Sequence, residues 1–282
     1  MSQIELTDCT YVYQQGTVNA QTAVDKINLQ IEPGELLAII GRGGSGKSTL
    51  SLMLSGLYPP TSGCVRVDGA VAEPGKIFRQ VGLVFQYPEQ QLFSDTIYNE
   101  IAFGARNFGA SEDELPAKVR EALTAVDLDP EIYSERSPFA LSGGQKRRVC
   151  IACLLAIDPS VVIFDEPTAG LDPEGRAWIK QLIVDLHETG HTVIWVSHDM
   201  AEVSEVADRV IVMRKGKIVM DGSPADVFSD TDRLADAGLE APAAAMVIND
   251  LKKAGVPLKG KAVTVRAAAE EIEEYLEGSS HV

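Results

Sequence analysis

The sequence predicts an α/β fold with a mostly parallel sheet at its centre, and three features indicate it. Apolar runs of strand length at 36–40, 161–164 and 192–197 are continuous, as in parallel strands that are buried on both faces. The first run leads through a glycine-rich turn into an apolar helix. The second ends in two carboxylates, and ligand chemistry gathers at the carboxyl ends of such strands. We therefore expect a sheet domain whose functional groups share one edge.

Length and charge narrow the class of protein. With 282 residues and 45% hydrophobic content, the chain suits one large domain, or one domain with an appendage. The formal net charge of -16 argues against a general nucleic-acid surface, which needs clustered Lys and Arg. The longest apolar run, 150–157, is too short to span a membrane, and the N-terminus lacks the basic region and apolar core of a signal peptide. We expect a cytosolic protein.

An antiparallel β subdomain is expected at the N-terminus. Residues 4–31 alternate as strands do, with a hairpin turn at 14–16. Tyr13 lies in this strand region, ahead of the nucleotide-binding fold, where an aromatic ring can stack on an adenine base, although an isolated tyrosine in a strand is usually a packing residue. We predict that Tyr13 contacts the base of a bound nucleotide.

The segment 41–48 reads Gly-Arg-Gly-Gly-Ser-Gly-Lys-Ser, a phosphate loop of the form G-x-x-x-x-G-K-S between a strand and a helix. Backbone N–H groups and the helix dipole form a concavity for a polyphosphate there, and glycines allow a close approach. Lys47 would reach the β- and γ-phosphates, and the Ser48 hydroxyl would ligate Mg²⁺. The residues predicted to contact ATP in this segment are Gly41, Gly43, Gly44, Ser45, Gly46, Lys47, Ser48 and Thr49.

Polar residues stand at the ends of three further apolar runs. Asp165 is placed to hold Mg²⁺ and Glu166 to polarise the attacking water. His198 reaches the same carboxyl edge from another run, and Gln86 follows a third, close enough to sense Mg²⁺ and the γ-phosphate. The predicted metal ligands are Ser48, Gln86 and Asp165, and the predicted catalytic residues are Glu166, His198, Gln86 and Lys47.

Residues 88 to about 155 have the pattern of an inserted helical subdomain. Its last helix opens at the sequence Leu-Ser-Gly-Gly-Gln. Ser142 is a natural N-cap, and the glycines leave the helix N-terminus bare for an outside anion. A plain helix cap is the alternative, for which this sequence is an unusual choice. The predicted ATP contacts are Ser142, Gly143, Gly144 and Gln145.

Two short patterns are typical of metal or redox sites. Residues 187–191 match the H-E-x-x-H pattern of zinc proteases, but Gly190 is expected to end the helix before His191. Cys150 and Cys153 form a C-x-x-C pair inside an apolar helical pattern that has no second ligand pair. We interpret the first as a helix end and the second as buried small residues.

We place the main domain at 1–230 and a C-terminal extension at 231–282. The extension is rich in Ala and Glu, and its apolar residues between 265 and 276 recur at helical spacing. We expect one amphipathic helix that buries a face against its own core or against a partner chain, which would make it a dimerisation element.

The order of these motifs resembles that of the ATP-binding-cassette ATPases over residues 1 to about 230. The resemblance implies the P-loop fold of that family. It also implies a head-to-tail dimer in which the phosphate loop of one subunit and the Ser-Gly-Gly segment of another enclose each ATP. Nucleic-acid-acting cassettes carry a long coiled coil or zinc-bearing insertion before that segment, and translation-associated cassettes carry two phosphate loops. Neither feature is found here.

Segments 85–93 and 137–145 resemble the ATPase subunits of energy-coupling-factor importers, which take up vitamins and metal ions in prokaryotes, and 251–258 resembles their C-terminal extension. The resemblance implies a second ATPase subunit, a transmembrane coupling protein and a membrane substrate-binding subunit, at the cytoplasmic face of the membrane. The segment 86–93 would contact the membrane partner, with Leu92 and Phe93 either as apolar anchors or as core residues. Arg42 occupies a position that is often Pro or His in the family.

Overall fold

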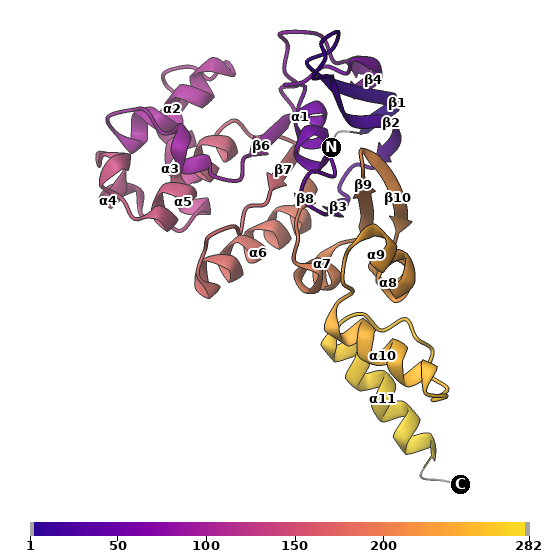
Figure 1. Cartoon of the computed structure of the whole chain (residues 1–282). Coiled ribbons are helices and arrows are strands. Elements are labelled where there is room, and N and C mark those ends of the chain that lie inside the picture. The colour runs from indigo at the N-terminus through magenta and orange to yellow at the C-terminus, as the bar shows by residue number, and fades with distance from the viewer. Residues whose placement is uncertain (1–2, 280–282) are drawn as a thin grey trace.

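The computed structural model describes residues 3–279 and contains a six-stranded sheet at its centre (Figure 1). The strand order is β10-β9-β3-β8-β7-β6, and only β10 runs antiparallel to its neighbour. This confirms the predicted, mostly parallel sheet. The strands are β3 (Leu36–Gly41), β6 (Val81–Val84), β7 (Val161–Asp165), β8 (Thr192–Val196), β9 (Arg209–Arg214) and β10 (Lys217–Gly222).

The small antiparallel sheet has the order β2-β1-β4-β5. Its strands are β1 (Ile4–Tyr13), β2 (Gln21–Ile31), β4 (Ser62–Val67) and β5 (Ala70–Val71). Helix α1 (Lys47–Leu54) shares one buried cluster with this sheet and with one face of the large sheet. Along β3, Leu37 and Ile39 face that cluster, whereas Leu36, Ala38 and Ile40 face the opposite one. Burial on both faces is the reason that the strand reads as a continuous apolar run.

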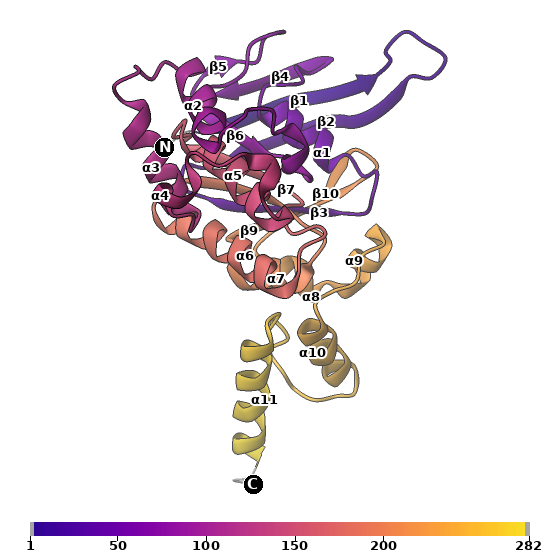
Figure 2. The ribbon, with the colours of Figure 1, turned by 90° about the vertical axis from the view of Figure 1, so that its left-hand side faces the viewer.

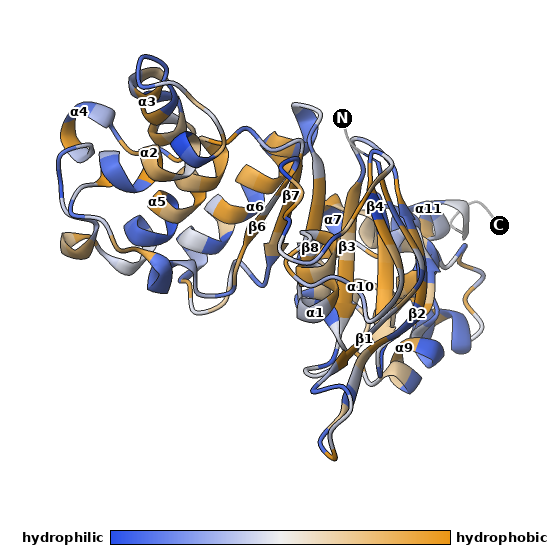
Figure 3. Ribbon diagram, turned by 90° about the horizontal axis from the view of Figure 1, so that it is seen from above, coloured by the Kyte–Doolittle hydropathy of each residue, from blue (hydrophilic) through white to orange (hydrophobic). Residues whose placement is uncertain are grey.

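A helical subdomain lies to one side of the large sheet, beyond β6 (Figures 1 and 3). Its elements are η1 (Pro88–Gln91), α2 (Ile97–Asn107), α3 (Leu115–Ala125), α4 (Pro130–Tyr133), η2 (Pro138–Ala140) and α5 (Gly143–Leu155). Helix α5 also packs against the sheet: a Cβ added at Gly82 in β6 would lie 2.8 Å from Leu154 of α5. Helix α5 of the subdomain therefore packs closely against strand β6 of the sheet.

Four helices follow the sheet strands and share the larger core: α6 (Pro173–Glu188), α7 (Met200–Val206), α8 (Pro224–Ser229) and α9 (Thr231–Ala237). Leu234 and Ala237 bury α9 in that core. The sequence places residue 231 at the start of the extension, whereas in the structure α9 packs as part of the main domain.

The projecting part of the chain is a pair of helices, α10 (Ala243–Lys253) and α11 (Val265–Ser279), that extends away from α8 and α9 (Figure 2). The two helices and the segment between them share a small core of their own, which contains Ala244, Ile248, Leu258, Ala262 and Ala268. Asn249 donates a hydrogen bond to Thr231 at 2.8 Å, which ties α10 to α9. The amphipathic helix predicted between 265 and 276 is α11, and the sequence analysis missed α10.

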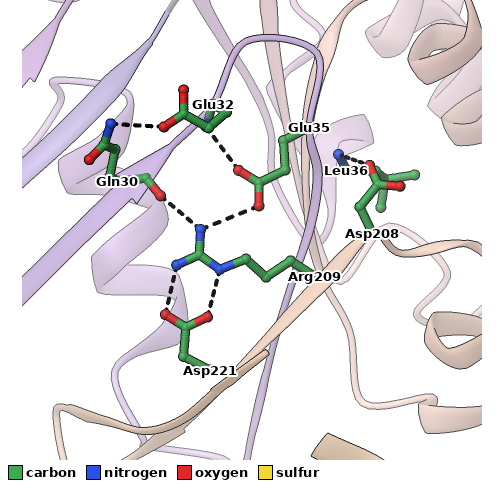
Figure 4. Close-up of polar contacts among 7 residues, drawn as sticks. All are labelled: Gln30, Glu32, Glu35, Leu36, Asp208, Arg209 and Asp221. Carbon is green, nitrogen blue, oxygen red and sulfur yellow. Dashed lines mark hydrogen bonds and ion pairs between the residues drawn. The ribbon is translucent and has the colours of Figure 1, made fainter. Parts of the chain in front are cut away.

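Arg209 joins four segments at the amino ends of the parallel strands (Figure 4). Its Nε and Nη2 donate to the two carboxylate oxygens of Asp221 at 2.6 and 2.7 Å. Its Nη1 donates to the Gln30 carbonyl at 2.9 Å and to Glu35 at 3.3 Å. These bonds fix the β9–β10 hairpin against β2 and the start of β3, and they leave the opposite edge of the sheet free for ligands.

Replacing this guanidinium tests its contribution to stability. Arg209→Met should lower the free energy of unfolding by about 1–3 kcal/mol, because several charged or carbonyl acceptors lose their donor. The matched control is Arg266→Met, which removes an exposed ion pair with Glu270 on α11 and should have a much smaller effect. Urea unfolding of both variants measures the difference. Equal losses would show that the Arg209 network does not stabilise the sheet.

Candidate functional site

The phosphate loop crosses from the end of β3 to the start of α1 and needs glycine at two positions. A Cβ at Gly41, with φ 155°, would lie 2.5 Å from the Met213 carbonyl oxygen, and one at Gly46, with φ 107°, would lie 2.3 Å from the Ala23 carbonyl oxygen. Glycine alone therefore fits this path of the backbone. The buried Ser45 hydroxyl has no hydrogen-bond partner among the described residues, so a polar ligand atom can satisfy it.

Lys47 begins α1, and its side chain is buried under the loop. Its Nζ donates to the carbonyl oxygens of Gly41 at 2.7 Å and of Arg42 at 3.3 Å. Burial lowers the pKa of Lys47, and the nearby carboxylates Glu166 and Asp165 oppose that change. An ammonium held inside a glycine loop is positioned to meet a phosphate anion.

Asp165 is the last residue of β7 and is buried. Burial raises its pKa, while the neighbouring Ser48 hydroxyl opposes the rise. Its Oδ1 has no hydrogen-bond partner among residues 3–279. A buried carboxylate oxygen beside a hydroxyl suits a hard divalent cation. The described residues contain no cluster of three His, Cys, Asp or Glu side chains that could hold a metal ion.

Glu166 and His198 meet at the same edge, as the sequence predicts for two residues that follow neighbouring strands. His198 Nδ1 lies 2.5 Å from Glu166 Oε2, and Lys47 Nζ lies 3.9 Å from Glu166 Oε1. The Glu166 backbone is left-handed, with φ 52°, and its N–H donates to the Val196 carbonyl at 3.0 Å. The three side chains line one hollow of about 640 Å³ on the open side of the loop.

Tyr13 lies on the other side of the phosphate loop. It lines a hollow of 200 Å³ with Gln21, Ala23 and residues 44–49. Its hydroxyl forms a hydrogen bond of 3.1 Å with the Thr49 hydroxyl, and its ring packs edge-on against Tyr11 at 5.0 Å. The predicted base contact and the predicted phosphate contacts are therefore neighbours.

Gln86 is placed less centrally. It follows β6 by two residues, its side chain is exposed, and it lines neither of the two hollows beside the phosphate loop. Its predicted roles in catalysis and metal binding remain predictions.

The Ser-Gly-Gly-Gln segment lies apart from the phosphate loop. Ser142 and Gln145 form a reciprocal capping box at the start of α5, with distances of 3.3 and 3.1 Å. A Cβ at Gly143 or Gly144 would meet no atom within 4 Å. Ser142, Gly144 and Gln145 line a separate hollow of 370 Å³ that contains no phosphate-loop residue. The segment thus caps its own helix, yet leaves its glycines open to an outside ligand.

Arg147 is a residue whose role the sequence analysis missed. It is buried in α5, and its Nη1 donates to the carbonyl oxygens of Pro167 and Ala169 at 2.8 and 2.9 Å. Its Nη2 lies 3.4 Å from the Gln86 carbonyl and from Glu89. One guanidinium therefore links the helix that follows Ser142 to the turn after Glu166 and to the segment after β6. The basic residues 146–148, which follow the two glycines, were the available signal in the sequence. The partners of Arg147 could not be identified from it, because they are distant in the sequence.

The two patterns typical of metal or redox sites have structural explanations. Helix α6 ends at Glu188 and Gly190 has φ 93°, so His187 and His191 do not share a helical turn. Cys150 and Cys153 are free thiols in α5, and burial raises the pKa of Cys150 to about 12. Such thiols are inert at neutral pH.

The segment 86–93 divides into core and surface. Leu92 packs into the main core, so its predicted role as a surface anchor is wrong and the alternative, a core residue of the helical subdomain, is correct. Phe93 is 61% exposed and packs edge-on against Phe103 at 5.0 Å. Gln90 and Gln91 are exposed. This leaves an aromatic and amide surface next to α2.

Known proteins resemble the chain over nearly its whole length. Residues 24–169 match the family model described as ABC transporter. The chain is 46% identical over 275 residues to the energy-coupling factor transporter ATP-binding protein EcfA2 of Clostridium tetani, which covers 95% of this chain and 96% of that protein.

Solved structures agree with the fold. The structure of cbiO1 from Clostridium perfringens, part of the ABC transporter complex cbiONQ, has a TM-score of 0.71 and 35% identity, and covers 89% of this chain and 98% of that one. The ATP-binding cassette MJ0796, a dimer bound to ADP and Pi after hydrolysis, has a TM-score of 0.70 and 30% identity, with coverages of 78% and 98%. Within residues 3–279, no helix has the length and apolar composition needed to cross a bilayer.

The contacts of Arg147 predict that it positions the site. Arg147→Lys keeps the charge but loses the planar fork, so nucleotide hydrolysis should fall roughly 10- to 100-fold while nucleotide binding is kept. The control is Arg106→Lys, which alters a similar fork to Glu112 on the exposed surface of α2. Steady-state hydrolysis and equilibrium binding measure the two properties. Equal rates for the two variants would contradict the positioning role.

Proposed function

Because the chain belongs to the ABC transporter family, and within it to the energy-coupling factor transporter ATP-binding proteins, we propose that it binds Mg²⁺ and ATP in composite sites of a head-to-tail dimer and drives uptake through membrane partners. The chain is an ATPase of this transporter class. The observation that carries the proposal is the meeting of Lys47, Glu166 and His198 in one hollow beside the glycine loop.

The residues suggest a division of roles around ATP. Tyr13 would contact the adenine, while the loop N–H groups and Lys47 would hold the phosphates. Ser48 and Asp165 would hold Mg²⁺, which neutralises developing phosphate charge when it is bound. Glu166 would accept a proton from the attacking water, with His198 keeping its carboxylate in place.

Two features favour a second ATPase subunit, identical or related. In one chain, α5 lies in the helical subdomain whereas α1 lies beside the sheets (Figure 1). Ser142 and Lys47 accordingly line different hollows. A partner that supplies its own Ser142 would complete the site. The extension also carries exposed apolar side chains suited to pairing. They are Met246, Val247, Val265 and Leu276.

The membrane partners would dock on the surface formed by Gln90, Gln91, Phe93 and Phe103. An exposed aromatic pair beside amides suits a helix of a transmembrane coupling protein. The transported substrate, a vitamin or a metal ion by resemblance, would bind to a separate membrane subunit. The ATPase would then work at the cytoplasmic face of the membrane.

A double substitution tests the docking surface and the transporter function together. Gln90→Ala with Gln91→Ala should leave ATP hydrolysis by the free ATPase unchanged, because both side chains are exposed and lie outside the nucleotide hollows. Assembly with the membrane subunits, or uptake in reconstituted vesicles, should be weakened. Gln15→Ala at the β1–β2 hairpin is the control. Normal assembly and normal uptake by the double variant would contradict docking at this surface.

A further inference from the structure

Arg42 is a charged residue of the phosphate loop, and the proposed division of roles around ATP does not use it. It is exposed and lines the 640 Å³ hollow together with Lys47, Glu166 and His198. Within residues 3–279, its guanidinium forms neither an ion pair nor a side-chain hydrogen bond. Lys47, in contrast, is buried and bonded to loop carbonyls. Two cations therefore line the hollow: Lys47, which is bonded to loop carbonyls, and Arg42, whose guanidinium is available to a ligand.

The segment 238–242, between α9 and α10, forms the far wall of the same hollow. Gly238 ends α9 with φ 75°, and a Cβ there would lie 2.6 Å from Cδ and 3.0 Å from Nη1 of Arg42. The arginine side chain therefore lies directly against this backbone. Because Leu234 and Ala237 bury α9 in the main core, the wall is anchored and can hold the side chain in place.

Among the residues that line the hollow, Arg42 is the exposed cation that an anionic ligand can contact. A planar guanidinium binds phosphate oxygens through two parallel hydrogen bonds, which a compact ammonium cannot do. The carboxylates Glu166, Asp199 and Glu240 line the same hollow, and they would repel a terminal phosphate that lacked a second cation.

We propose that Arg42 binds the terminal phosphate of ATP, that it makes the site favour ATP over ADP, and that Gly238 positions it. The inference rests on the proposed ATP site. It also joins the nucleotide to the segment that leads into α10 and α11, since Arg42 touches both. Arg42 is the residue that contacts the ligand, and Gly238 acts through it.

The first test measures the dissociation constants of ATP and ADP, each with Mg²⁺, in a Glu166→Gln chain, which should not hydrolyse ATP because it lacks the proton-accepting carboxylate. Adding Arg42→Ala should weaken ATP binding by about tenfold or more and ADP binding by less than about threefold. Arg42→Lys should restore part of the loss, because it restores charge without the fork. Arg79→Ala, which removes the same charge from a residue that lines a different hollow, is the control and should change neither constant.

The second test separates positioning from backbone strain. Gly238→Ala and Gly255→Ala both place alanine at a positive φ near a helix end, but a Cβ at Gly255 meets no atom within 4 Å. Only Gly238→Ala should lower the preference for ATP over ADP. In the Arg42→Ala background, Gly238→Ala should lower it no further. A loss that persists in that background would overturn the positioning role.

The outcomes distinguish a failure of the Arg42 role from a failure of the proposed ATP site. If the Glu166→Gln chain binds neither nucleotide, the proposed ATP site itself is wrong. If that chain binds ATP but Arg42→Ala leaves the ratio of the two dissociation constants unchanged, the ATP site stands and the role of Arg42 is wrong. The Arg42 variants alter no glycine conformation, so they decide this point even if Gly238→Ala fails to fold.

Discussion

The parallel pairing of β3, β8 and β7 is the constraint on which the site depends. Their register brings the ends of three segments, far apart in the sequence, to one carboxyl edge. Lys47, Glu166 and His198 meet there although about 150 residues separate the first from the last. The Arg209 network holds the opposite edge, so that the hairpin β9–β10 stays paired with β3. The Arg209 bonds thus lie at the amino ends of the parallel strands, and the candidate site lies at their carboxyl ends.

The same topology separates Ser142 from Lys47 within one chain, because the two residues line different hollows. Helix α5 carries Ser142 to the helical subdomain, and Arg147 then ties that helix to the turn beyond Glu166. A movement of the helical subdomain would therefore displace the turn after Glu166, because the buried Arg147 guanidinium is bonded to that turn. Arg42 and Gly238 would provide a second connection, from the phosphate loop to the C-terminal helices. Both connections would link the proposed nucleotide site to a surface proposed for a partner.

Much of the fold and part of the site could be predicted because they depend on local signals. The phosphate loop needs glycines at fixed spacing, and buried parallel strands need continuous apolar runs. The contacts of Arg147 and Arg42 could not be predicted, since their partners lie far away in the sequence. Leu92 shows the same limit: its burial is set by the packing of the helical subdomain. The packing of α9 against the main core likewise depends on tertiary contacts that its composition does not reveal.

The central claim, that one ATP is held by Lys47 of one subunit and Ser142 of another, is tested most directly by mixing two inactive chains. Lys47→Ala removes the phosphate cation, and Ser142→Arg blocks the opposing cap. In a mixed pair, one composite site keeps both native residues and the other loses both. An equal mixture should recover hydrolysis, up to about a quarter of the wild-type rate if pairing is random. A mixture no more active than either variant alone would contradict the shared site.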